Sequence, residues 1–536
     1  MAELSQPTQK LISRYQAWYQ SLQPKEGETT IHVDEIASAV AAFYEKIREV
    51  VEWREEHLMR RAAIERILKR RLLLFKNGEP LAEPFVLELV RGGHFPNDRI
   101  PESKIGEVQK LIDKYIFIMA NASVPPREKA KIQLYDWILG IAACEVEETL
   151  CPSQRENALI EYMMELMMEG IKVREGVFIV GGLNEEEKNS QIFIAIQRAL
   201  FKLDPPIITY NLLKRRYPQW RDFTKDNLQL QEIVKNIYSI WDSLAKNLKH
   251  PLAERFYKIC ERYDTPYLLI GDIATANPDN FSEFAEDPVQ LEAAMKDAYI
   301  IRLGKLKGKM SRAAFYGTLS VFLSKVLIAL AAEIPFDKYI THEFNMTALG
   351  ISVAVPPLLM LLLVTSIKTS SEENFQKVML EVMRVTYATD KRNVHELTSP
   401  KKKGVIMSTV IYAMYLSSFM LSFGSLYLIL TSLNFSTLSS IVFLLFVSLI
   451  TFGGTKIRQR GAELLIGEQK QGFLYSLFDF FTLPLIEVGR WLSHQVARYN
   501  ILVMLLNFLI EIPFQIFVEF LEHWRSFLKE KKEGVH

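Results

Sequence analysis

Hydrophobic and polar positions divide the chain near residue 312. Before that point apolar residues recur at helical spacing among many charged ones, and beyond it long uncharged stretches alternate with basic loops. Apolar residues spaced three to four apart predict α-helices, whereas "EGVFIVGG" at 175–182 is the one strand-like piece of sequence. We therefore predict an all-α protein with a cytosolic helical domain over 1–310, a transmembrane domain over 311–455 and a C-terminal region over 456–536.

The first part is predicted to be a series of helices, the longest from about Asp34 to Phe75. Others begin after "NDRIPES", "VPPRE", "CPSQRE" and "LNEEE", each with a proline or polar cap near its start. In the last of these, Asn184 is expected to cap the helix while Glu187 reaches back to it. A phosphate-binding loop would need glycine directly before lysine, but three glutamates precede Lys188. We therefore interpret this segment as a helix start.

Four stretches are long and apolar enough to cross a membrane. A helix needs about 20 apolar residues for this, because no water satisfies open backbone groups inside the bilayer. The third stretch carries no charged residue, which is rare for a helix in a soluble core. The sequence thus predicts a four-helix transmembrane bundle with spans at about 313–334, 347–367, 405–432 and 435–455, and a cytosolic loop at 368–404.

The basic residues predict the orientation of these spans. Lysine and arginine gather before the first span, in the loop 368–404 and after the fourth span, while the two opposite loops contain only Lys338. Cytoplasmic loops carry the excess of such residues. The first residues also lack the apolar core of a signal peptide. We therefore expect a multi-pass membrane protein with both termini in the cytoplasm.

Lys325 lies near the middle of the first predicted span. A lysine at this depth costs roughly 3 kcal/mol on insertion scales. Two interpretations stay open: the side chain snorkels towards the lipid surface, or it faces the bundle interior and pairs with Glu333, Asp479 or Glu511. Glu333 is expected to reach water at the far end of the span, where Pro335 would start a new turn.

The region 473–528 contains two apolar runs, each interrupted by a proline and followed by an amphipathic pattern. The prolines are Pro484 and Pro513, and Trp491 and Trp524 follow them. Tryptophan is favoured at the boundary between lipid and water. We interpret these stretches as amphipathic interfacial or re-entrant helices with the two tryptophans as anchors; the alternative is two further spans.

Hydroxyl-bearing and small residues are frequent in the third span. Small residues allow helices to pack closely in lipid, and we favour that use over the alternative of a polar pathway. The residues are Ser408, Thr409, Ser417, Ser418, Ser422, Gly424 and Ser425.

Composition and motifs point away from enzymes and from nucleic-acid binding. Lys and Arg number 64 against 63 Asp and Glu, whereas a nucleic-acid-binding protein is usually strongly basic. The basic runs Arg60–Arg71 and Lys214–Trp220 are interpreted as solvated helix faces rather than sites for nucleic acid or anionic lipid. HExxH, GxSxG and GxGxxG are absent from the sequence. We predict no catalytic, cofactor or metal site and no enzymatic activity.

The three cysteines are too few and too scattered for a disulfide framework, which indicates a reducing compartment. Cys144 and Cys151 are seven residues apart, with glutamates nearby. Two thiols without a histidine are more often small buried apolar residues than metal ligands, and we interpret them so.

The chain is similar to uncharacterised multi-pass bacterial inner-membrane proteins. The similarity rests on "LVRGGHFPNDRIPESKIGEVQKLIDKY", "FTLPLIEVGRWLS" and "FLIEIPFQIFVEFLEHW"; it implies the bacterial inner membrane and no known activity. We expect a membrane-anchored helical interaction or scaffold protein that binds a protein partner through its cytosolic domain. The alternative is an ion or small-solute channel or transporter that uses Lys325. The sequence sets no oligomeric state.

Overall fold

The computed structural model describes most of the chain. The described residues are 3–22, 29–33, 56–74, 80–173, 183–342, 344–365, 372–388, 395–397, 404–462, 464–466, 473–499, 516, 520, 524 and 527–528. They are almost entirely helical, as the sequence predicts. The chain divides into two compact units: the first contains Met1–Met295, Met379–Ser399 and Leu509–His536, and the second contains Lys296–Val378 and Pro400–Phe508.

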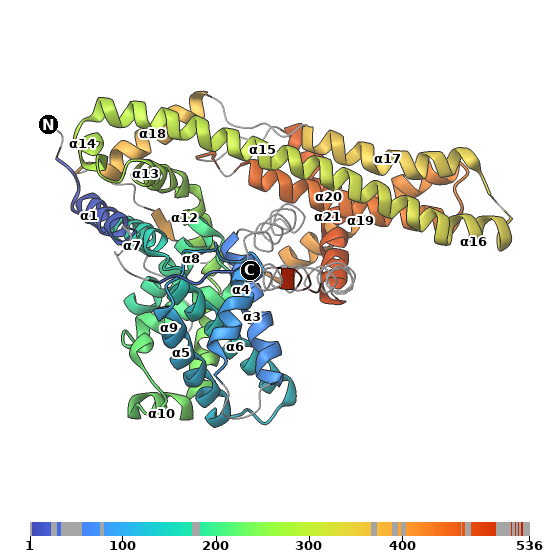
Figure 1. Ribbon diagram of the computed structural model, residues 1–536. Helices are drawn as coiled ribbons and strands as arrows, with labels where there is room; N and C mark the ends of the chain where they lie inside the picture. The colour runs from blue at the N-terminus through green and yellow to red at the C-terminus, as the bar shows by residue number, and fades with distance from the viewer. Residues whose placement is uncertain are drawn as a thin grey trace. The chain divides into compact units, whose positions relative to one another are not determined.

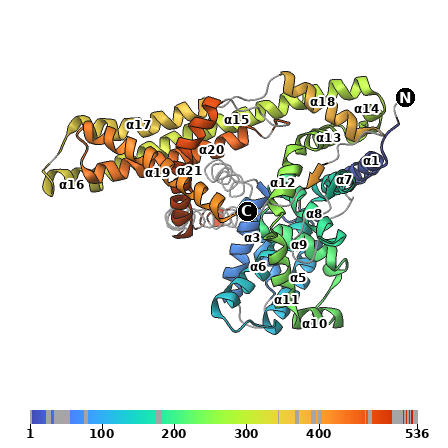
Figure 2. The ribbon, with the colours of Figure 1, turned by 180° about the vertical axis from the view of Figure 1, so that it is seen from behind.

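The first unit is helical (Figures 1 and 2), and residues between 31 and 244 form a large apolar cluster in it. Helix α6 lies at its centre, and a run of its residues is buried on all sides. Helices α3, α5 and α9 pack against α6. The elements are α1 (Gln6–Ser21), α3 (Glu56–Leu74), α4 (Ala82–Arg91), α5 (Ser103–Asn121), α6 (Glu128–Leu150), α7 (Gln154–Gly170), β1 (Ile171–Val173), α8 (Glu185–Phe201), α9 (Pro205–Arg216), the 3₁₀ turn η1 (Trp220–Asp222), α10 (Leu228–Lys235), α11 (Ile237–Leu248), α12 (Ala253–Arg262), α13 (Asp264–Ala276) and α14 (Phe281–Glu286).

A segment from the predicted loop 368–404 belongs to this first unit. Helix α18 (Glu372–Thr386) ends there, and its last carbonyl accepts hydrogen bonds from Ser5 N at 2.9 Å and Thr8 Oγ1 at 3.0 Å. Strand β2 (His395–Leu397) pairs with β1 in a short parallel sheet. The loop therefore contributes helix and strand to the first unit.

The predicted helix start at Asn184 is confirmed. Asn184 Oδ1 accepts from the backbone N–H of Glu187 at 2.6 Å, and Glu187 Oε2 accepts from the N–H of Asn184 at 3.2 Å. The described part of the predicted 34–75 helix is α3. The strand-like piece 175–182 lies outside the described residues.

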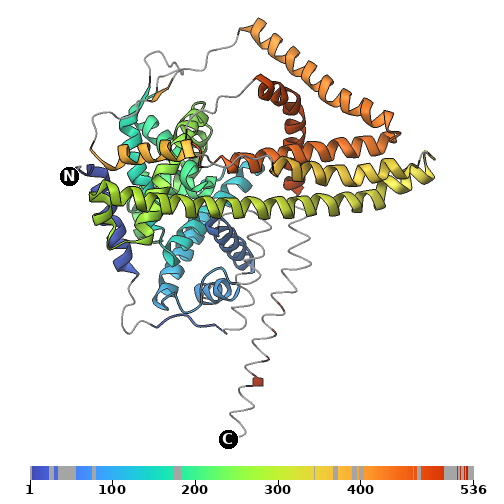
Figure 3. The ribbon, with the colours of Figure 1, turned by 90° about the horizontal axis from the view of Figure 1, so that it is seen from above.

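Four helices, to which the second unit contributes most residues, are long and apolar enough to cross a membrane. The first is longer than predicted, because α15 (Pro288–Ile328), the π-turn η2 (Ala329–Glu333) and α16 (Ile334–Tyr339) follow one another as one continuous run. The others are α17 (Met346–Thr365), α19 (Val405–Ser432) and α20 (Thr437–Gly461). Within the second unit, α15, α17 and α20 lie side by side (Figure 3).

Helix α21 (Phe473–Tyr499) packs against both α19 and α20. It continues as a helix through Pro484, where the sequence predicts an interruption. Gly489 makes the closest approach: a Cβ atom there would lie 2.1 Å from the carbonyl oxygen of Ser448 in α20. Trp491 is 59% exposed, and Trp524 is 50% exposed. Most of the second predicted stretch, including Pro513, lies outside the described residues.

Gly489→Ala tests the close packing of α20 and α21. The added methyl group would force the two helices apart, and we expect it to lower the free energy of unfolding by about 1–3 kcal/mol. Gly424→Ala in α19 is the matched control, because no atom lies within 4 Å of a Cβ built there. Its effect is expected to be neutral or stabilising by up to about 1 kcal/mol, since alanine favours helix more than glycine. Thermal unfolding in detergent measures both, and equal effects would contradict the packing.

Candidate functional site

The charge that the sequence singles out is buried within the second unit. Lys325 in α15 and Glu333 in η2 are both 0% exposed, and their side chains form an ion pair. An isolated charge in such surroundings would cost far more than a paired one. Of the three candidate partners, the structure therefore brings Glu333 to Lys325, and Glu333 is buried where the sequence predicts exposure to water.

The π-turn explains how two residues eight positions apart meet. In a regular α-helix they would lie about 80° apart around the axis. A π-turn inserts one extra residue into the helix. Glu333 therefore lies where the seventh residue after Lys325 would lie in a regular α-helix, about 20° from Lys325 around the axis. Ile334 accordingly donates its N–H to Ala329, five residues back. Pro335 follows at once, and the wider turn accommodates a ring that has no N–H and would crowd the preceding turn.

Two neighbouring helices complete the surroundings of the ion pair. Ser352 of α17 donates from Oγ to Glu333 Oε2 at 3.2 Å. The ammonium of Lys325 lies 5.4 Å from the ring centroid of Phe446 in α20, a distance at which a cation is attracted to an aromatic face. The pair thus connects the first long helix with α17 and α20.

A second acidic side chain lies one helical turn beyond Glu333. Asp337 in α16 is 8% exposed, and its Oδ2 accepts from Ser439 Oγ of α20 at 3.0 Å. Within the described part of the chain, Asp337 Oδ1 and the neighbouring Ser440 Oγ are buried without a hydrogen-bond partner. These atoms have unused hydrogen-bonding capacity that a proton, a water molecule or a cation would satisfy.

The remaining predicted partners lie elsewhere. Asp479 is a half-buried residue of α21, and among the described residues no ion pair joins it to Lys325. Glu511 lies outside the described residues.

Two hydroxyl groups of the serine-rich helix α19 form hydrogen bonds with α21. Pro484 has no N–H, so the carbonyl of Phe480, four residues earlier, loses its partner within the helix. Ser418 Oγ donates to that carbonyl at 2.5 Å, and Ser422 Oγ donates to the carbonyl of Phe481 at 2.7 Å. Hydroxyl groups of neighbouring helices commonly satisfy such carbonyls in apolar surroundings. The two serines therefore serve helix packing.

Three glutamates of α6 hold the first unit together, and sequence reasoning missed their role. Glu145 accepts from Lys114 of α5 at 2.5 Å and Glu147 from Arg60 of α3 at 2.9 Å. The third, Glu148, accepts from Lys214 of α9 at 2.8 Å. The signal in the sequence was the acidic run "EVEE" inside an apolar helix.

Glu145 is the most enclosed of the three. Its Oε2 accepts from Tyr115 Oη at 2.7 Å and from Trp220 Nε1 at 3.0 Å. Burial lowers the pKa of Lys114, and its pairing with Glu145 opposes that effect. The two oxygens of Glu145 thus have partners from α5 and η1, as a buried charge requires.

The chemistry of the cysteines gives no metal site in the described residues. Burial raises the pKa of the Cys144 thiol well above its usual range, which keeps it protonated and a poor ligand. Cys151 is exposed. Among the residues that the structure describes, no three histidine, cysteine or acidic side chains form a group that could hold a metal ion.

Comparison with protein-family models, curated proteins and solved structures finds no match for this chain.

Lys325→Leu tests the ion pair. It would leave the Glu333 carboxylate buried without its partner, and we expect the free energy of unfolding in detergent to fall by about 3–5 kcal/mol. The double variant Lys325→Leu/Glu333→Leu removes both charges and is expected to recover most of that loss. Lys338→Leu removes an exposed lysine of α16 and should leave stability unchanged. Unchanged stability in Lys325→Leu would contradict the pairing.

Proposed function

We propose that the chain is a membrane-anchored helical interaction protein. In this proposal the four long apolar helices cross the bacterial inner membrane and hold the first unit at its cytoplasmic face, where that unit binds a protein partner. The observation that carries the proposal is that the Lys325 ammonium already has Glu333 and Phe446 as partners within its own unit. A charge used in this way holds helices together instead of contacting a solute.

Ion pairs between helices of the first unit support the same proposal. Glu145, Glu147 and Glu148 each meet a basic residue from a different helix. Inter-helix pairs of this kind define one packed arrangement of helices. A rigid helical domain presents a fixed surface to a partner, which is what a scaffold requires.

A second candidate is passage of a proton or cation. Two atoms of the second unit favour it, Asp337 Oδ1 and Ser440 Oγ. Both are buried and have no hydrogen-bond partner among the described residues. Intramembrane acidic residues often mark ion pathways. Proton flux and sodium flux into liposomes, measured for the wild type and Asp337→Asn, decide between the candidates. Wild-type flux that Asp337→Asn abolishes would favour passage.

The proposed orientation predicts which positions react with an impermeant thiol reagent in intact cells. Single cysteines at Tyr339 and Asn434 should be labelled, because these exposed positions, at the end of α16 and between α19 and α20, lie on the side that the proposed orientation puts outside. Cysteines at Lys305 and Arg458 should stay protected until the membrane is opened. All variants carry Cys151→Ser, since that native cysteine is exposed. Labelling of the Arg458 position from outside would overturn the orientation.

The interaction itself is tested by mild cross-linking in native membranes followed by purification of the tagged full chain. We expect a partner at a fixed ratio to the chain, absent when an unrelated four-span protein is purified in the same way. Recovery of the chain alone would contradict the proposed function.

A further inference from the structure

The first unit contains an open pocket of about 760 Å³ at the ends of α9, η1, α10 and α11. We propose that this pocket binds an extended segment of a protein partner in which an acidic, an apolar and a basic side chain follow one another. The inference rests on the proposed function and names the kind of partner that the first unit would take.

The local sequence explains why a pocket forms here. Helix α9 ends at Arg216, and Pro218 follows, a residue common just after a helix end. Asn227 begins α10 by accepting hydrogen bonds from two backbone N–H groups, of which Gln229 gives the shorter, at 2.8 Å. Asn236 alone separates α10 from α11. These three helix ends leave a space between them that their side chains line.

The floor of the pocket is apolar, and it belongs to the core of the unit. Phe223, Ile233 and Ile240 line the pocket while being only 6%, 8% and 5% exposed. Residues so well packed give a rigid surface that one apolar side chain of a partner can cover. Burial of such a side chain stabilises a complex by about 1.5–3 kcal/mol before the costs of association.

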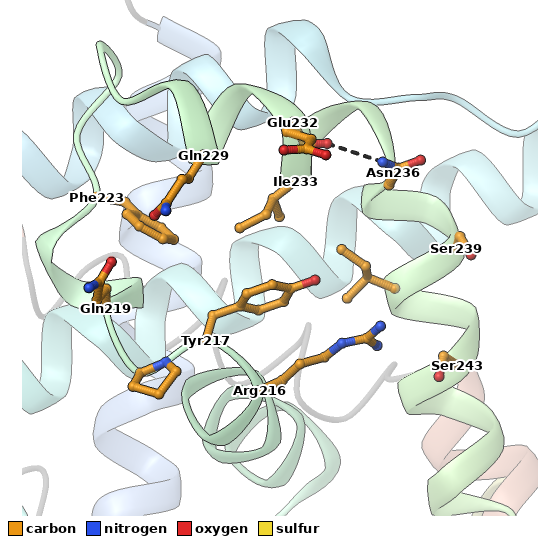
Figure 4. A pocket seen from close by; sticks show the side chains of 12 residues that line it. Arg216, Tyr217, Gln219, Phe223, Gln229, Glu232, Ile233, Asn236, Ser239 and Ser243 are labelled. Atoms are coloured by element: carbon orange, nitrogen blue, oxygen red, sulfur yellow. Dashed lines mark hydrogen bonds between the residues drawn. The ribbon is translucent and has the colours of Figure 1, made fainter.

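Two opposite charges stand on facing walls (Figure 4). Arg216 lies at the end of α9, and its guanidinium is 5.7 Å from the ring centroid of Tyr217. Glu232 projects from α10 on the opposite side, with Tyr217 between the two. Neither side chain forms an ion pair with another described residue. Arginine recognises a carboxylate with two parallel hydrogen bonds, and Glu232 offers a carboxylate to a basic side chain.

Amide and hydroxyl side chains fill the rest of the rim. Gln219, Gln229 and Asn236 carry amides, which donate and accept at once and so match the N–H and C=O of a peptide bond. Ser239 and Ser243 add hydroxyls along one face of α11 (Figure 4). Tyrosine, serine and asparagine are the residues that binding surfaces use for adaptable polar contacts. A polar rim of this kind over an apolar floor suits a peptide backbone.

The size of the pocket agrees with a peptide of a few residues. Ligand sites of about 300–1,000 Å³ enclose drug-sized molecules, and this pocket lies within that range. A single amino acid would leave much of it empty. A ligand that reaches from Arg216 across the apolar floor to Glu232 must be an extended segment. It needs an apolar residue with one charged residue on either side.

The probes for the test are fluorescent nonapeptides with a glycine–serine background, measured by polarisation against the full chain in nanodiscs. They carry glutamate, leucine and lysine in that order at several spacings, and a matched set carries glutamine in place of both charged residues. We expect at least one charged peptide to bind tenfold more tightly than its neutral counterpart. Equal binding of both sets at every spacing would overturn the proposal.

Charge reversal locates the binding in the pocket. Arg216→Glu is expected to weaken the best peptide at least tenfold and to bind more tightly the version in which lysine replaces its glutamate. Lys225→Glu is the matched control, because it makes the same change at an exposed residue outside the pocket lining; it should keep wild-type binding. Circular dichroism verifies that each variant is folded. Equal losses in both variants, or none in Arg216→Glu, would overturn the site.

The cross-linking experiment separates this inference from the function on which it rests. If the wild type yields a partner and Arg216→Glu yields much less, both stand. A partner recovered equally with both proteins overturns the pocket and leaves the proposed function intact. If the wild type yields no partner, the proposed function fails, whereas the peptide measurement still decides whether the pocket binds.

Discussion

An ammonium group among apolar side chains is tolerated only when a counter-charge lies within its reach, and that constraint shapes the second unit. The counter-charge is on the same helical run, but a regular helix would turn it away from Lys325. The π-turn at Ala329–Glu333 corrects the direction by one residue. Ser352 of α17 donates to Glu333 and Phe446 of α20 lies beside Lys325, so the ion pair connects the first long helix with both neighbouring helices.

Charged side chains in the first unit also have partners of opposite charge, but these partners lie farther away in the sequence. The partners of Glu145, Glu147 and Glu148 come from residues 31, 87 and 66 positions away. Removing either member of such a pair would leave a buried or half-buried charge without its partner, so each pair favours the packing that brings its two helices together. Because α6 supplies all three carboxylates, it organises the unit both through its apolar surface and through its charges.

The sequence predicts those features that depend on local pattern or on simple length. The four long apolar helices follow from hydropathy, and the cap at Asn184 follows from spacing alone. The sequence left the partner of Lys325 open among three acidic residues. Glu333 did not stand out, because residues eight positions apart do not lie on the same face of a regular α-helix. The position of a π-turn depends on how neighbouring helices pack, which no local pattern records.

The same limit applies to the pairs of α6 and to the segment that ends in β2. Their partners are distant in sequence, and only the folded chain brings them together. Pro484 was a misleading signal: it predicts an interruption, but α21 continues through it, since Ser418 and Ser422 donate to the carbonyls of Phe480 and Phe481. Pro335 lies in the first turn of α16, as predicted, but the π-turn before it keeps α16 continuous with the first long helix.

The hydrogen bonds from Ser418 and Ser422 also bear on the order in which the protein assembles. Their acceptors, Phe480 and Phe481, are made 62 and 59 residues later in synthesis. Until α21 arrives, α19 has hydroxyl groups whose nearest acceptors are the carbonyls of its own helix; Ser422 already donates to Ser418 at 2.7 Å. The contact between α19 and α21 can form only after residue 481 has been made, and a nascent chain that stops before residue 473 would contain all four long apolar helices without it.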